Sequence, residues 1–94
     1  MANGQRQPEG LIGVLLDPSA RLDERDDAAM DLAKFDEPSV EEALLQVVLN
    51  HSEDELVADS AGESLRNIWD RKLKYVEPLV AQMHPAARRL FDAP

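Results

Sequence analysis

The chain has 94 residues, of which 19 are acidic and 10 are basic, and its formal net charge is −9. A chain of this length forms one domain, with a core that buries about 60–65% of the unfolded surface. It contains no cysteine. This excludes disulfides, thiolate nucleophiles and cysteine-based metal sites, and it is compatible with a reducing compartment.

Residues 1–9 are polar and are expected to form a disordered tail. They lack the apolar stretch of a secretory signal peptide. No apolar run elsewhere approaches the ~18 residues that a membrane-spanning helix needs. The sequence therefore predicts a cytoplasmic protein that does not contact a membrane.

From residue 10 onward, apolar residues recur at helical spacing, and no segment alternates long enough to form a strand. The predicted fold class is therefore all-α, with one domain over residues 10–94. The first helix is expected over about 10–16, because Asp17-Pro18 ends it. The second is expected over about 21–35, followed by a turn at 36–38.

The third and fourth helices are expected to start with capping boxes, in which two side chains each bond a free backbone N–H. Ser39 with Glu42 would begin a helix that ends near residue 49. Ser52 with Glu55 would begin a helix over about 53–70. Further on, Pro78 and Pro85 each suit the first turn of a short helix, the second of them over about 85–91.

The chain repeats itself at an offset of 33 positions. Residues 11–17 (LIGVLLD) align with residues 44–50 (LLQVVLN), and further matches follow at the same offset. These are Asp26 with Asp59, Ala28 with Ala61, Leu32 with Leu65 and Phe35 with Ile68. Such a period predicts stacked helical hairpins, that is, a short α-solenoid. Repeat 1 would cover residues 10–36 and repeat 2 residues 38–70, with a C-terminal capping unit over 75–92.

The repeat resembles a known family. Residues 15–18 (LLDP), Arg25, the Ala28-Ala29 pair and Leu32 are similar to HEAT-like repeats of the short phycobilin-lyase type, over residues 10–70. Ankyrin and tetratricopeptide repeats have similar periods, but their signature motifs are absent. One departure is Ala58, which stands where repeat 2 would carry the arginine of the family.

Residues 22–32 and 58–65 also resemble small, free-standing bacterial HEAT-like proteins, some of which resemble immunity proteins. The resemblance implies a protein-binding function, with neutralisation of a cognate bacterial toxin as the preferred interpretation. A scaffold or assembly adaptor and an accessory of a chromophore-lyase pathway remain alternatives. No nucleophile, phosphate-loop, dinucleotide or zinc-protease motif is present, so the sequence predicts no enzyme, no cofactor and no metal.

Charge is distributed unevenly along the chain. Residues 17–63 hold 15 acidic and three basic side chains, whereas residues 64–94 hold six basic and three acidic ones. The acidic part should repel nucleic acid and attract a basic protein. Simple solvation of acidic helix faces is the alternative explanation.

The candidate partner-binding residues lie on the helices over 21–35 and 53–70. Asp27, Asp31 and Lys34 form a row opposite the expected core, and Ser60, Ser64 and Asn67 form the equivalent row of repeat 2. The predicted surface is a groove that contains Asp26, Asp27, Asp31, Lys34, Asp59, Ser60, Glu63 and Asn67.

Four other polar or aromatic residues have structural interpretations. Arg25 is expected to tie adjacent turns together, and His51 to lie in a surface turn. His84 occupies the position of Asp17 and Asn50 in the repeat and is expected to cap a helix end. Trp69 is expected to pack against the C-terminal unit.

Overall fold

The computed structural model describes residues 7–92, and within that range the chain forms helices and turns but no strand. The predicted all-α fold class is confirmed. The predicted tail at residues 1–9 falls mostly outside the described residues, and Glu9 already belongs to the first helix. The elements are α1 (Glu9–Leu16), α2 (Leu22–Asp31), the 3-10 helix η1 (Leu32–Lys34), α3 (Pro38–Val48), α4 (Glu55–Arg71), α5 (Glu77–Ala81) and α6 (Pro85–Asp92).

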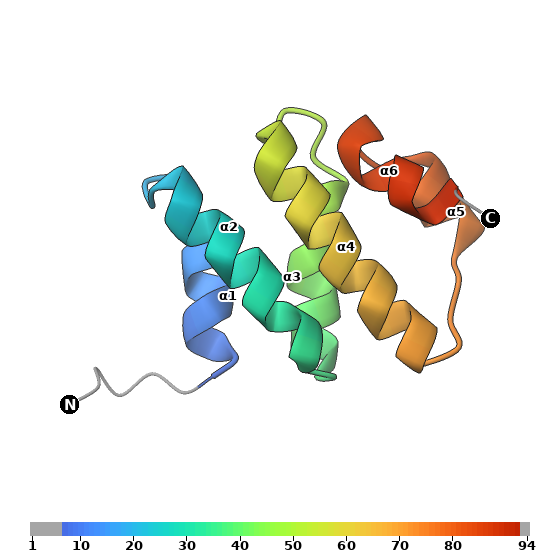
Figure 1. Ribbon diagram of the computed structural model, residues 1–94, viewed down its shortest axis with the longest axis horizontal. Helices are drawn as coiled ribbons and strands as arrows, with labels where there is room; N and C mark the ends of the chain where they lie inside the picture. The colour runs from blue at the N-terminus through green and yellow to red at the C-terminus, as the bar shows by residue number, and fades with distance from the viewer. Residues whose placement is uncertain (1–6, 93–94) are drawn as a thin grey trace.

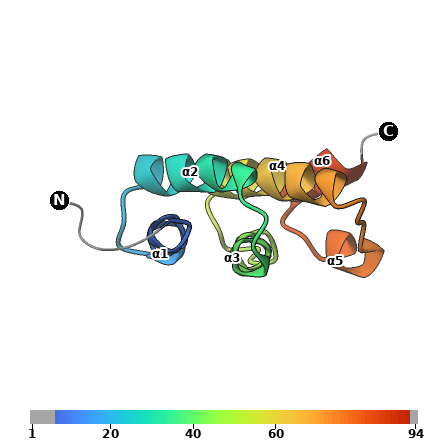
Figure 2. The ribbon, with the colours of Figure 1, turned by 90° about the horizontal axis from the view of Figure 1, so that it is seen from below.

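The helices form two layers. Figure 2 shows α1, α3 and α5 side by side in one layer and α2, α4 and α6 in the other. Within the second layer, α4 lies between α2 and α6, as Figure 1 shows. The molecule measures 44 × 27 × 17 Å along its principal axes. The chain thus advances along the long axis as three helix pairs, α1–α2, α3–α4 and α5–α6.

The core lies between the layers and between neighbouring helices of the second layer. Leu32 and Leu65, which are matched in the repeat, are both completely buried, as the helical spacing predicts. Trp69 is 1% exposed and packs edge-on against Phe91 of α6, with ring centroids 5.4 Å apart. The other large buried side chains are Leu15, Val40, Leu44, Val48, Val57, Ile68 and Met83.

Both predicted capping boxes are wrong. Helix α3 starts one residue early, with Pro38 in its first turn, because the fixed φ of proline suits that position and no N–H needs a partner there. At the start of α4, Asp54 caps the helix instead of Ser52. Its carboxylate accepts hydrogen bonds from the backbone N–H groups of Leu56 (2.9 Å) and Val57 (3.3 Å), and a charged acceptor favours the positive end of the helix.

The turns of the three helix pairs share one hydrogen-bond pattern. Asp17, Asn50 and His84 occupy the same position, and each side chain accepts the backbone N–H two residues further on. The donors are Ser19 (2.9 Å), Ser52 (3.0 Å) and Ala86 (3.0 Å). Hydrogen bonds from the Ser19 hydroxyl and N–H also lower the pKa of the Asp17 carboxyl. The structural interpretation of His84 is therefore confirmed.

In the second layer, residues of α2 and of α4 that are 33 positions apart each contact the following helix, although the positions that they meet on that helix are not 33 apart. From α2 to α4, the Ser60 hydroxyl donates to the Asp26 carboxylate and the Ser64 hydroxyl donates to the Ala29 carbonyl (2.6 Å). From α4 to α6, the positions equivalent to 26 and 29 are again in contact. Asp59 accepts a hydrogen bond from Arg89 (2.8 Å), and Gly62 lies against Ala87.

At Gly62, α4 packs closely against α6. A Cβ at this position would lie 2.8 Å from the Cβ and 2.9 Å from the Cα of Ala87. Because one of those atoms is backbone, the contact cannot be relieved by a side-chain rotation. Glycine costs about 1 kcal/mol relative to alanine inside a helix, and this close packing is the reason that it is tolerated.

We predict that Gly62→Ala lowers the free energy of unfolding by about 1–3 kcal/mol, because overpacking outweighs the gain in helix propensity. Gly13→Ala is the matched control. Gly13 lies in α1, and a Cβ there would meet nothing within 4 Å, so the same substitution should stabilise by about 0.5–1 kcal/mol. Urea unfolding of both variants gives the comparison. Equal stability of Gly62→Ala and wild type would show that α6 does not pack this closely.

Candidate protein-binding surface

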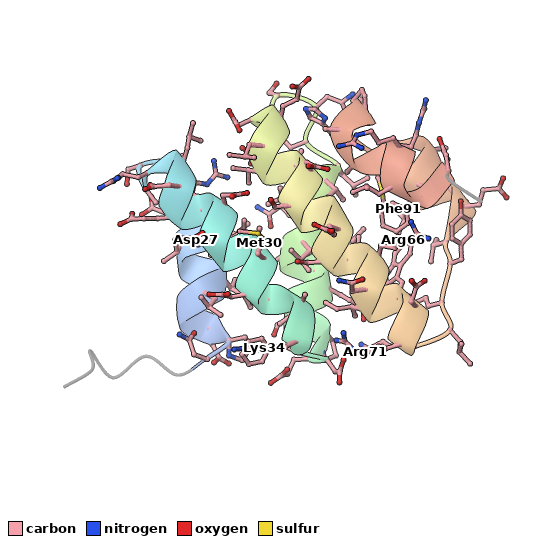
Figure 3. All side chains as sticks on the ribbon, in the orientation of Figure 1. Asp27, Met30, Lys34, Arg66, Arg71 and Phe91 are labelled. Atoms are coloured by element: carbon pink, nitrogen blue, oxygen red, sulfur yellow. The ribbon has the colours of Figure 1, made fainter. Side chains whose placement is uncertain are left out.

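Exposed carboxylates on α2 form the first part of the predicted surface. The inward positions of α2 are Ala28 and Ala29, and Leu32 of η1 continues them, so the helical period turns Asp27 and Asp31 outward. Both are exposed, and no cation among residues 7–92 lies within salt-bridge distance of either carboxylate. In Figure 3, Asp27 lies on the side of α2 that faces away from α4.

The remaining predicted residues divide into exposed and buried groups. Lys34, Glu63 and Asn67 are exposed, and the Lys34 ammonium lies 5.6 Å from the centre of the Phe35 ring. In contrast, Ser60 is 7% exposed and bonds Asp26, while Asp59 pairs with Arg89. Ser64 is also buried, at 2% exposure.

The prediction that positions 60 and 64 form an open row is therefore corrected. Helical periodicity separates inward from outward positions, but α4 also has a neighbour on each side within its own layer. Ser60 and Ser64 face α2, so they contact a helix instead of solvent. Asp27, Asp31, Lys34, Glu63 and Asn67 remain as exposed residues of the predicted surface.

A groove that the sequence analysis missed runs along the outer edge of the α1–α2 pair. It has a volume of about 310 Å³ and is lined by Leu11 and Val14 of α1 and by Glu24, Asp27, Ala28 and Asp31 of α2. Val14 is 36% exposed. The spacing of Leu11 and Val14 predicts only that both residues face inward. The repeat carried a signal for the groove, because α1–α2 is the first helix pair within the described residues and no other pair precedes it there.

The turns next to this surface are tied together by Arg25. Its Nε donates to the Leu15 carbonyl (2.9 Å), and its two terminal nitrogens donate to the Glu53 carboxylate at 3.0 and 2.6 Å. Both side chains are nearly buried, at 12% and 8% exposure. The bidentate geometry is the strong form of an arginine–carboxylate pair. The structural interpretation of Arg25 is confirmed, and its role is internal.

We predict that Glu53→Gln lowers the free energy of unfolding by about 3–5 kcal/mol, because it leaves the buried guanidinium without a counter-charge. The control is Asp70→Asn, which breaks the exposed pair between Asp70 and Arg66. An exposed i, i+4 pair contributes about 0.3–0.5 kcal/mol. Thermal and urea unfolding of both variants gives the two values, and a loss below about 1 kcal/mol for Glu53→Gln would contradict the role assigned to this pair.

A second buried carboxylate, Glu41 of α3, holds the opposite end of the α3–α4 pair. It is 7% exposed and accepts hydrogen bonds from Lys72 (2.6 Å), Lys74 (2.8 Å) and the Trp69 indole N–H (3.0 Å). Burial alone would raise the pKa of the Glu41 carboxyl. The three donors outweigh that effect and lower the pKa from 4.5 to about 2.

The depressed pKa of Glu41 makes stability depend on pH with a defined sign. The carboxylate contributes fully above its unfolded pKa of 4.5, and the contribution is lost as the pH falls towards 2. We expect a loss of about 1–3 kcal/mol over this window, less than the full shift because the two lysines are partly exposed. Urea unfolding between pH 5 and 2.5 checks this. Glu41→Gln should be less stable at pH 6 and should lack this part of the slope; an unchanged slope would contradict the assignment.

The two histidines have structural contacts. Because the His84 Nδ1 accepts the Ala86 N–H, its Nε2 carries the proton and donates to the Glu53 carbonyl at 3.1 Å. The Nε2 of the exposed His51 lies 2.7 Å from the Gln82 carbonyl oxygen. Within residues 7–92 there is no group of three or more acidic or histidine side chains arranged to hold a metal ion.

Comparisons with known protein families, with curated proteins and with solved structures gave no match to this chain. Among the described helices, none combines the length and the apolar character that crossing a membrane requires.

Proposed function

We propose that this chain is a non-enzymatic protein-binding module, built as a short α-solenoid of HEAT-like hairpins, which captures a basic partner through the exposed carboxylates of α2. The preferred biological role is that of a cytoplasmic bacterial immunity protein that neutralises a cognate toxin. The single observation that carries this proposal is that Asp27 and Asp31 are exposed, while Asp26, Glu53 and Asp59 are engaged in internal contacts.

The contrast between the two kinds of carboxylate supports a binding role. Glu41, Glu53 and Asp54 each accept several internal hydrogen bonds, and so they hold the fold together. Asp27 and Asp31 project from one helix face without such contacts among residues 7–92. Adjacent like charges disfavour the isolated fold slightly, whereas they speed the capture of a basic protein by electrostatic steering.

The solenoid part of the proposal is supported by residues 33 positions apart on α2 and α4, each of which contacts the next helix of the second layer. Positions 26 and 29 of α2 meet α4, and positions 59 and 62 of α4 meet α6. A structure assembled by such steps offers an extended surface to a partner. The groove of about 310 Å³ beside α2 is open along the surface, which suits a macromolecular partner better than an enclosed small substrate.

A scaffold or assembly adaptor is the second candidate. The observation that favours it is the presence of half-exposed apolar side chains beside the acidic ones, namely Leu22, Met30 and Leu56. An adaptor in a permanent complex would bury these residues, and its association would depend little on salt. Salt dependence therefore distinguishes the two candidates.

To test the proposed function, the partner is isolated with the tagged full-length chain from its native source, and association rates are measured at low and high salt. Asp27→Lys combined with Asp31→Lys should slow association at low salt by about tenfold or more. At high salt, screening should reduce the difference. Circular dichroism should be unchanged, since both side chains point away from the core.

Glu42→Lys combined with Glu77→Lys is the matched control, because both residues are exposed in the other layer, on α3 and α5, and the two changes alter the net charge as much as the double variant of α2 does. It changes the net charge in the same direction without altering α2, and we expect a smaller effect on the association rate. Equal rates for wild type and the double variant at low salt would exclude the α2 face as the docking surface.

A further inference from the structure

We infer that the groove between α1 and α2 is a docking site for a basic amphipathic helix, which lies beside α2 as α2 lies beside α4. This inference rests on the proposed protein-binding function and identifies the site and the kind of partner. Residues 33 positions apart occupy equivalent sites in the α1–α2 and α3–α4 pairs, so their exposure can be compared directly.

The residues that line the groove are the counterparts of buried residues. Leu11 and Val14 correspond to Leu44 and Val47, which are 0% and 2% exposed. On the second helix of the pair, positions 24, 27 and 31 correspond to Val57, Ser60 and Ser64, which are 0%, 7% and 2% exposed. The α3–α4 pair thus uses this face to receive α1–α2, and the same face of α1–α2 is open.

The chemistry of the open face differs from that of the buried one in a single respect. Both faces carry apolar side chains on the first helix of the pair. On the second helix, the open face has Glu24, Asp27 and Asp31 where the buried face has Val57, Ser60 and Ser64. These three positions are spaced i, i+3 and i+7 and therefore form one stripe along α2. The face keeps the shape that accepts a helix but carries three carboxylates.

The hydrogen bonds of the buried face indicate what the occupant must supply. Ser60 and Ser64 donate to acceptors on α2, the Asp26 carboxylate and the Ala29 carbonyl. Ionised carboxylates at the equivalent positions can only accept. The occupant must therefore present donors with positive charge, which means lysine or arginine at matching helical spacing, together with apolar side chains for Leu11 and Val14.

A second copy of the chain is a poor occupant of this groove. Two copies of net charge −9 repel each other. The helix that performs this role inside the chain is α2, and in a second copy it would bring further carboxylates against the stripe. The edge of α6 carries Arg88 next to Asp92, and nearby α5 carries Glu77, so it also lacks a row of unopposed cations. Charge complementarity therefore favours a basic helix from another protein.

The test uses the full-length ¹⁵N-labelled chain and a synthetic helical peptide of about 18 residues, long enough for partial helicity in water. The peptide carries adjacent leucine and arginine stripes. A second peptide of the same composition has these residues scrambled, so that it keeps the charge but loses the stripes. We expect the patterned peptide to shift backbone resonances of α1 and the outer edge of α2, and to bind at least tenfold more tightly than the scrambled one.

Two variants locate the site. Val14→Lys places a positive charge, which repels the peptide, on the apolar side of the groove and should weaken peptide binding at least tenfold. Leu56→Lys is the matched control, because Leu56 is an exposed apolar residue outside the groove, at the start of α4, and should leave the affinity unchanged within about twofold. Since Val14 is already 36% exposed, both variants should fold, which circular dichroism verifies.

Three outcomes would overturn the inference: equal binding of the two peptides, resonance shifts centred on another face, or self-association of the chain that disappears in Val14→Lys. The proposed function is tested separately, by measuring the affinity of the natural partner for the same variants. If that partner binds Val14→Lys as well as wild type but loses affinity for the Asp27/Asp31 double variant, the groove is excluded while binding through the acidic face stands.

Discussion

The buried ion pair between Arg25 and Glu53 is the interaction on which the rest of the structure depends. Arg25 bonds the Leu15 carbonyl at the end of α1 and the Glu53 carboxylate before α4, and the backbone carbonyl of Glu53 accepts the His84 ring N–H before α6. A continuous row of hydrogen bonds, which forms a line across the molecule, therefore joins one turn from each of the three helix pairs. Neither partner can be lost without leaving an uncompensated buried charge, so the line fixes how the pairs lie beside one another, and with it the orientation of the outer face of α2.

The surface follows from a small change in side-chain polarity on a repeated framework. In the second layer, α4 has α2 at one edge and α6 at the other. On α4, small residues at both edges allow close contact, with Ser60 and Ser64 towards α2 and Gly62 towards α6. On α2, the groove-lining edge carries Glu24, Asp27 and Asp31 instead. The positions that contact a neighbouring helix in the α3–α4 pair thus form a charged groove in the α1–α2 pair.

Much of the fold could be predicted from the sequence, because helical spacing depends only on local order: Leu32 and Leu65 are buried as expected, and His84 performs the capping role of Asp17 and Asn50. The helix starts were less predictable, since Pro38 and Asp54 compete with the two serines as initiators. The candidate surface was predicted only in part. Periodicity cannot distinguish solvent from a neighbouring helix within the same layer, so Ser60 was assigned to the surface and the groove beside Val14 was missed.

We expect that the turns joined through Arg25, Glu53 and His84 make the three helix pairs unfold as one cooperative structure. The most direct test is urea unfolding of the wild-type chain followed by two signals, the fluorescence of Trp69, which reports the contact between α4 and α6, and circular dichroism, which reports all helices. The two curves are expected to coincide, with one midpoint and one slope. Loss of a third of the helical signal before any change in Trp69 fluorescence would show that α1–α2 unfolds independently, and it would contradict the role given to Arg25 and Glu53.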